Sequence, residues 1–241
     1  MTPLEFALLA LVILAAACLQ GSIGFGMGML AAPFIALIDA TLLPVLVIVL
    51  AMVVTLIVVV LDRASLDLRG AGWALAGRVP GSVVGAGLLT IMSTAVLSWA
   101  VAAVVLLGVL VSLRGWHPRV TRSTQALAGA LSGVMGTTTS VGGAPMAIVW
   151  QGSDGPRLRG TMSAFFLVGS SLSLVALFLW GAVPPHAVLT AAWMMPIAIA
   201  GVALSRFVNR FLNRRRTRAI ALGASALGAL TLIVTRLFGM G

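Results

Sequence analysis

Two glycine-rich stretches carry residue types that can bind an anion inside an otherwise apolar chain. The first is GSIGFGMGMLAAP, residues 21–33, and the second is GVMGTTTSVGGAP, residues 133–145. Glycine allows a helix to break there, because it adopts backbone conformations that a Cβ disfavours. The returning helix then starts with N–H groups that lack carbonyl partners, around residues 25–28 and 139–143, and with the positive end of its dipole. Such helix ends favour negatively charged ligands.

Hydroxyl groups and one arginine add to this anion-binding chemistry. Residues 137–140 are three threonines and a serine, a polar cluster that is unusual inside an apolar segment. Arg78 is the only arginine well inside such a segment. Two interpretations of Arg78 stay open: its side chain extends to the membrane surface, or it faces a central cavity. In a cavity, the planar guanidinium would suit bidentate contact with an oxyanion.

The candidate substrate-binding residues come from these three features. They are Gly24, Phe25, Gly26, Gly28, Arg78, Gly136, Thr137, Thr138, Thr139, Ser140, Gly142 and Gly143. Tight helix packing is a second interpretation of the glycines, because Gly24 and Gly28, for example, have the GxxxG spacing. We expect no catalytic residue, cofactor or metal, because His117 and His186 lack neighbouring ligands and no nucleophile is paired with a base by spacing.

The composition requires a membrane environment for most of the chain. Hydrophobic residues make up 61% of it and charged residues 8%. A helix needs roughly 17 to 25 apolar residues to cross the hydrocarbon core of a bilayer. Apolar segments occur at about residues 4–38, 43–61, 71–91, 95–113, 124–150, 160–180, 187–205 and 219–238. We therefore expect an all-α polytopic membrane protein, placed in the bacterial inner membrane.

Positive charge is concentrated between the apolar segments. The chain has 15 arginines, no lysine and five acids, for a net charge of +10. Thirteen of the arginines lie in four short segments, at residues 62–69, 114–122, 154–159 and 206–218. This distribution is typical of cytoplasmic loops, so we expect both termini outside and no nucleic-acid partner. Residues 206–218 are predicted to form an amphipathic helix on the membrane surface.

A repeat relates the two glycine-rich stretches. Shifting the sequence by 112 residues superposes Gly21 on Gly133 and Pro33 on Pro145. Each copy is followed by three simple apolar segments, and an odd number of crossings inserts the second copy upside down. Inverted repeats with broken helices at matching positions are the architecture of secondary transporters, in which the breaks mark the binding site.

The apolar segment at residues 124–150 must enter and leave the membrane on one side. It lies between two arginine-bearing loops, and its arms of about 13 and 11 residues are too short for two full crossings. A re-entrant hairpin is therefore predicted here and, by the repeat, at the start of the chain. The two repeats span residues 1–113 and 114–241, each with one broken hairpin and three transmembrane helices, in a single integrated membrane domain.

The duplicated motifs resemble those of the TauE/SafE family of sulfite-exporter-like permeases. Each glycine-rich stretch opens one half of this lysine-free chain, so the resemblance covers essentially all of it. The resemblance implies export of small sulfur-containing anions, such as sulfite, sulfoacetate or other organosulfonates, driven by an ion gradient. It points to Gly21, Gly24, Gly26, Gly28, Pro33, Gly133, Gly136, Gly142, Gly143 and Pro145. The threonines at 137–139 depart from the usual glycine-rich form and leave the choice of anion open.

Three functions stay open from the sequence. A secondary transporter ranks first, a passive anion channel second, and a scaffold subunit that moves no solute third. The expected partners are the lipid bilayer, a small anionic substrate and a coupling ion, H⁺ or Na⁺, and a homodimer is left open. The five acids lie at or near segment ends, which disfavours proton coupling through a buried carboxylate.

Overall fold

The computed structural model describes residues 1–66, 71–114, 119–150, 155–211 and 214–238. Within these ranges the chain forms ten α-helices, two short 3₁₀ helices and no strand, which confirms the all-α prediction. The helices are α1 (Pro3–Ile23), α2 (Met27–Asp39), η1 (Ala40–Leu42), α3 (Val45–Leu61), η2 (Arg63–Ser65), α4 (Ala71–Ile91), α5 (Thr94–Arg114), α6 (Arg122–Thr139), α7 (Gly143–Val149), α8 (Gly155–Leu179), α9 (Pro185–Phe211) and α10 (Arg214–Leu237).

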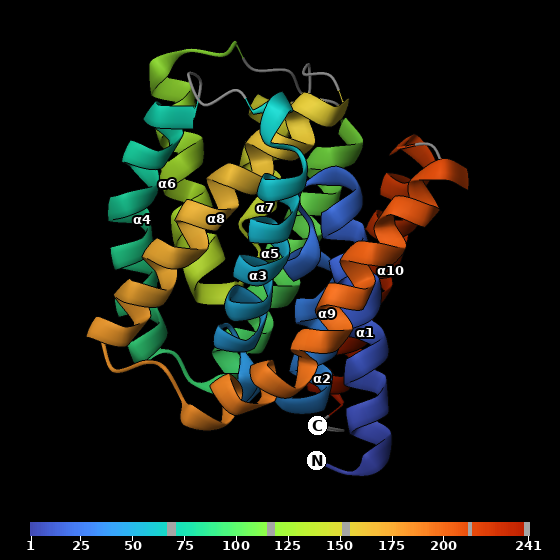
Figure 1. Ribbon diagram of the computed structural model, residues 1–241. Coiled ribbons are helices and arrows are strands. Elements are labelled where there is room, and N and C mark those ends of the chain that lie inside the picture. The colour runs from blue at the N-terminus through green and yellow to red at the C-terminus, as the bar shows by residue number, and fades with distance from the viewer. Residues whose placement is uncertain (67–70, 115–118, 151–154, 212–213, 239–241) are drawn as a thin grey trace.

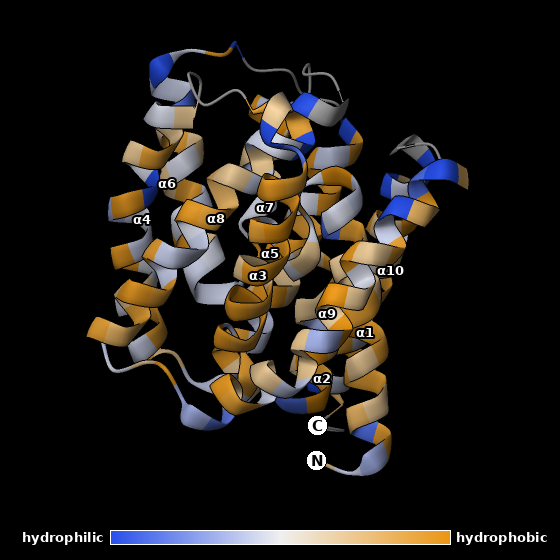
Figure 2. Cartoon of the chain, viewed as in Figure 1, coloured by the Kyte–Doolittle hydropathy of each residue, from blue (hydrophilic) through white to orange (hydrophobic). Residues whose placement is uncertain are grey.

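Several helices have the length and composition needed to cross a membrane. In the described part of the chain there are six of them, within α1, α4, α5, α8, α9 and α10, and α3 is a shorter apolar helix of 17 residues. Figure 2 shows apolar residues along the middle of the bundle and polar residues gathered at its ends. The chain is therefore a multi-pass membrane protein, as its composition predicts.

Two hairpins open toward opposite ends of the bundle. In Figure 1, α1 and α2 form a hairpin that opens at the end where both chain termini lie, and α6 and α7 form one that opens at the other end. The long arm α1 packs on α9 of the second half, the long arm α6 packs on α4 of the first, and α3 packs on α8. This exchange of partners supports the inverted repeat, although a two-fold relation between residues 1–113 and 114–241 stays a prediction.

The glycine spacing predicts helix breaks at residues 21–24 and 133–136, and both breaks lie a few residues later. The first falls at Gly24 and Gly26, whose φ angles of +87° and +104° favour glycine, and the second begins at Ser140, with φ of 61°. Helix α6 continues through the threonine run, where the hydroxyls of Thr138 and Thr139 donate to carbonyls one turn back in the same helix and so need no partner outside it. The expected arms of similar length are therefore wrong: α6 has 18 residues and α7 has seven, and α1 has 21 against 13 for α2.

The predicted surface helix at residues 206–218 is also wrong. Helix α9 continues through Arg206 and Arg210 and ends at Phe211, and α10 begins at Arg214. No glycine or proline occurs between Gly201 and Gly223, so nothing in the sequence stops α9 before its last arginines. The two arginines extend a bundle helix rather than lying along the membrane surface.

The arginine-rich end of the bundle is predicted to face the cytoplasm. Hydrophilic residues of the described chain gather at the end opposite to the chain termini (Figure 2), and the arginines of η2 and of the starts of α6 and α8 belong to that end. The positive-inside rule then sets the orientation. In a Cys18→Ser background, Ser65→Cys and Ala182→Cys variants are expected to react with an impermeant thiol reagent from opposite sides of the membrane. Reaction from the same side would overturn this topology.

Candidate functional site

The tips of the two hairpins touch through their backbones. Gly28, in the first turn of α2, lies so close to the second break that a Cβ built on it would overlap the carbonyl oxygen of Ser140. Within the second hairpin, Gly142 lies close to the long arm α6, because its Cβ would be 2.7 Å from the carbonyl oxygen of Ser132. Only glycine permits these approaches. The breaks thus meet near the middle of the bundle.

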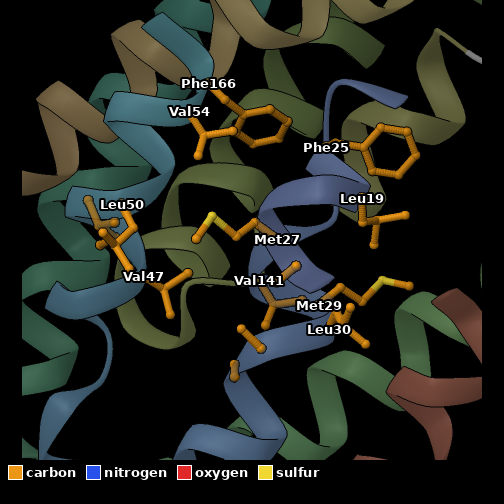
Figure 3. Close-up of a cluster of buried hydrophobic side chains, with 14 of the residues drawn as sticks. Leu19, Phe25, Met27, Met29, Leu30, Val47, Leu50, Val54, Val141 and Phe166 are labelled. Atoms are coloured by element: carbon orange, nitrogen blue, oxygen red, sulfur yellow. The ribbon is translucent and has the colours of Figure 1, made fainter. Parts of the chain in front are cut away.

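A cavity of about 40 Å³ lies where the tips meet. Its lining comes from α1, α2, α3, α4, α6, α7, α8 and both breaks. Apolar side chains form much of its surroundings, and Figure 3 shows Met27 and Val141, one from each hairpin, within this buried cluster near α3. The cavity is therefore lined by both halves of the chain.

Each break is bridged by a polar side chain from the long arm that precedes it. The side-chain oxygen of Gln20 accepts a hydrogen bond from the Met27 backbone N–H at 3.0 Å. The Ser132 hydroxyl donates to the Gly142 carbonyl oxygen at 2.6 Å. Gln20 and Ser132 are 112 residues apart, the offset of the repeat. The Met27 N–H, expected to be free for an anion, is therefore satisfied within the chain.

Arg78 of α4 lies in the cavity lining and not at the membrane surface. Its side chain is only 3% exposed. Nη1 donates to the Ser132 hydroxyl oxygen at 2.5 Å, so Ser132 links Arg78 to the second break. The guanidinium carbon lies 5.0 Å from the ring centre of Phe165 and 5.3 Å from that of Phe166, both on α8. These faces stabilise the cation partially.

The charge of Arg78 has no counterion among the residues that the structure describes. Its Nε is buried without a hydrogen-bond partner. The described acids are engaged elsewhere: Glu5 caps α1, Asp39 caps η1, and Asp62 pairs with Arg159. A buried, unpaired cation is costly in a low-dielectric interior. The site is therefore suited to an anion.

The structure brings seven of the twelve candidate residues to the cavity lining. They are Gly26, Gly28, Arg78, Gly136, Ser140, Gly142 and Gly143. Thr137 lies behind the lining, and its hydroxyl is 2.7 Å from that of Ser173, which does line the cavity. The hydroxyls of Thr138 and Thr139 bond to their own helix.

The remaining two candidates pack around the first break. Phe25 lies against Gly143 of the opposite hairpin, where a Cβ built on Gly143 would be 3.2 Å from the Phe25 ring. Gly24 lies against the backbone of Arg159, with its would-be Cβ 2.6 Å from that carbonyl oxygen. Both hold the tip in place outside the cavity.

Sequence reasoning missed the polar partners of the cavity. Gln20, Ser132, Ser170 and Ser173 lie inside apolar segments, and a polar residue in such a segment is itself a sequence signal. Gln20 and Ser132 carry a second signal, because they occupy equivalent positions of the repeat. Among the described residues, no three His, Cys, Asp or Glu side chains come together as metal ligands would.

A helical membrane protein whose two broken helices meet at a buried cavity has the architecture of a secondary transporter. The chain belongs to the TauE/SafE family, because the family model described as Sulfite exporter TauE/SafE matches residues 9–232. It is therefore a membrane transporter of the sulfite-exporter, anion-permease type. No curated protein and no solved structure matches the chain.

Proposed function

We propose that this protein exports small sulfur-containing anions across the bacterial inner membrane by alternating access, with the substrate bound in the cavity between the two hairpin tips. Sulfite, sulfoacetate and other organosulfonates are the substrate class. The observation that carries the proposal is Arg78, a cation buried in the cavity without a counterion in the described chain. The membership in a sulfite-exporter family supports the same class of ligand.

The electrostatics of Arg78 favour an anion over a neutral solute. Burial removes the guanidinium from water, and the rings of Phe165 and Phe166 replace only part of that hydration. Of the five N–H donors of the guanidinium, the one on Nη1 that reaches Ser132 is used. A sulfite or sulfonate oxyanion supplies both a compensating charge and acceptors for the free donors.

The size of the cavity favours a compact anion in this conformation. It measures about 40 Å³, and a water molecule needs about 10–15 Å³ on this measure. There is room for a few waters or one small oxyanion. Sulfite fits with the least rearrangement, and sulfoacetate requires the hairpin tips to move apart.

A carrier is favoured over a passive channel by the contact between the tips. The backbones at Gly28 and Ser140 leave no room for a pore between them, so passage requires the hairpins to move. In proteoliposomes loaded with sulfite, a carrier exchanges external labelled sulfite for internal sulfite with saturable kinetics. Flux that rises linearly with concentration and lacks exchange would identify a channel.

Ligand binding to the purified protein tests the proposal directly. Sulfite and small sulfonates are expected to raise the melting temperature in proportion to the logarithm of their concentration, because a ligand of the native state stabilises it by mass action. Carboxylates of similar size are expected to act more weakly, and neutral sulfones not at all. Equal effects of charged and neutral compounds would overturn the assignment of an anion site.

Gly169 of α8 provides the space that the Arg78 side chain occupies. A Cβ built on Gly169 would overlap the guanidinium, whereas a Cβ on Gly223 of α10 would meet no atom within 4 Å. Gly169→Ala is expected to fold, because the arginine side chain can rotate away, and to weaken anion binding about tenfold or more. Gly223→Ala is the matched control and should bind as the unmodified protein does. Unchanged affinity in Gly169→Ala would contradict the placement of Arg78 at the anion.

A further inference from the structure

A second polar cavity lies beside the first hairpin tip, at the arginine-rich end of the bundle. It measures about 30 Å³, and its polar lining consists of Asp62, Arg159, Ser205, Arg206 and Asn209. These side chains come from the end of α3, the start of α8 and the last turns of α9. The cavity therefore joins helices of both halves.

The charges around this second cavity leave a net positive site. Arg159 makes a bidentate pair with Asp62, with Nε 2.5 Å from Oδ2 and Nη2 2.9 Å from Oδ1. The two side chains remain partly exposed, Arg159 by 25% and Asp62 by 12%. Arg206 has no hydrogen-bond or ion-pair partner in the described part of the chain, so its charge is available to a ligand. Asn209, three residues further along α9, adds an amide donor.

The end of α1 is the wall between the two cavities. Gln20 lines the central cavity and the next residue, Gly21, lines the second. Along α3, Ala51 lines the central cavity and Val58 the second, a separation of about 10 Å at 1.5 Å per residue. A solute in the second cavity is thus next to the hairpin tip that must move for the central cavity to open.

We propose that the second cavity is a separate binding site for a small oxyanion, occupied before the central cavity is reached from the arginine-rich side. Arg206 and Arg159 are its cationic ligands. Asp62 is a competitor, because its carboxylate and the incoming anion bind the same guanidinium of Arg159. This inference rests on the proposed transport function, since it supplies that function with an entrance site.

The number of anions bound per chain tests the entrance site. Equilibrium dialysis of the full-length protein in lipid-free detergent, with ³⁵S-sulfite under nitrogen, is expected to give two anions per chain. Arg206→Gln should weaken the entrance site about tenfold, as expected for loss of a charge-assisted hydrogen bond. The matched control is Arg210→Gln, because Arg210 lies one turn further along α9 and outside both cavity linings. This variant should still bind two anions per chain.

The Asp62→Asn variant gives a second test, because it is expected to raise the affinity of the entrance site, whereas structural damage would lower it. Removing the competing carboxylate frees Arg159 for the anion, so the entrance site should bind sulfite more tightly, by about tenfold. A variant that simply damages the fold would bind more weakly and melt at a lower temperature. Weaker binding by a stably folded Asp62→Asn protein would overturn the competition.

The two proposals fail in distinguishable ways. If the protein binds one anion per chain, and this binding persists in Arg206→Gln but is lost in Arg78→Gln, the entrance site is overturned and the central site is supported. If the single bound anion persists in Arg78→Gln but is lost in Arg206→Gln, the entrance site is supported and the central site is overturned. Loss of the second anion in phosphatidylglycerol nanodiscs, but not in phosphatidylcholine nanodiscs, would assign the cavity to a lipid phosphate and overturn the proposal.

Discussion

Replacing Arg78 by Gln is expected to lower the affinity for sulfite by about a hundredfold or more, since losing one partner of a buried charge pair costs roughly 2–5 kcal/mol. The ligand-free variant should also melt at a higher temperature than the unmodified protein. The reason is that Arg78 is 3% exposed and has no counterion among the described acids, so the substitution removes an uncompensated buried charge. Thermal melts with and without sulfite measure both effects.

The control for this variant is Arg236→Gln. Arg236 of α10 also donates to a serine, with Nη2 3.2 Å from the Ser98 hydroxyl oxygen, but lines neither cavity. It should bind sulfite as the unmodified protein does. Arg78→Lys should recover only part of the lost affinity, because it keeps the charge and loses the planar fork. Full affinity in a stably folded Arg78→Gln protein would assign anion binding to other groups.

The features that the sequence predicts well are those set by local chemistry. The first helix break depends on Gly24 and Gly26, whose positive φ angles favour glycine, so a glycine-rich stretch inside an apolar segment predicts a hairpin. Arg78 stands out because a charge inside an apolar segment needs a partner or a function. The family resemblance carried by the motifs of both halves is confirmed by the family model that matches residues 9–232.

The features that the sequence predicts poorly depend on which surfaces meet in space. A run of hydroxyls indicates a polar break, but the hydroxyls of Thr138 and Thr139 find acceptors one turn back in their own helix, and the second break lies after them, at Ser140. Ser132 gains its role from two partners distant in sequence, Arg78 and Gly142. Such contacts are decided by packing between helices, which the hydrophobic periodicity of the chain does not encode.

The glycines have two interpretations, helix packing and substrate binding. Two glycines that make the same kind of backbone contact, one beside the cavity and one away from it, distinguish them. A Cβ on Gly28 would overlap the Ser140 carbonyl oxygen beside the cavity, and a Cβ on Gly129 would overlap the Ala74 carbonyl oxygen between α6 and α4. Both overlaps involve backbone, which cannot rotate away. Each alanine substitution should therefore destabilise the protein by about 3 kcal/mol or more.

Binding distinguishes Gly28 from Gly129, because only Gly28 lines the cavity. Gly28→Ala should push the hairpin tips apart, move the second break away from Arg78 and abolish measurable sulfite binding and exchange. Gly129→Ala should keep the affinity of its folded fraction. Gly72→Ala, where a Cβ meets no atom within 4 Å, should be neutral or slightly stabilising in its helix. If Gly28→Ala and Gly129→Ala lower stability equally and both retain affinity, the contact between the tips is packing alone and the anion binds elsewhere.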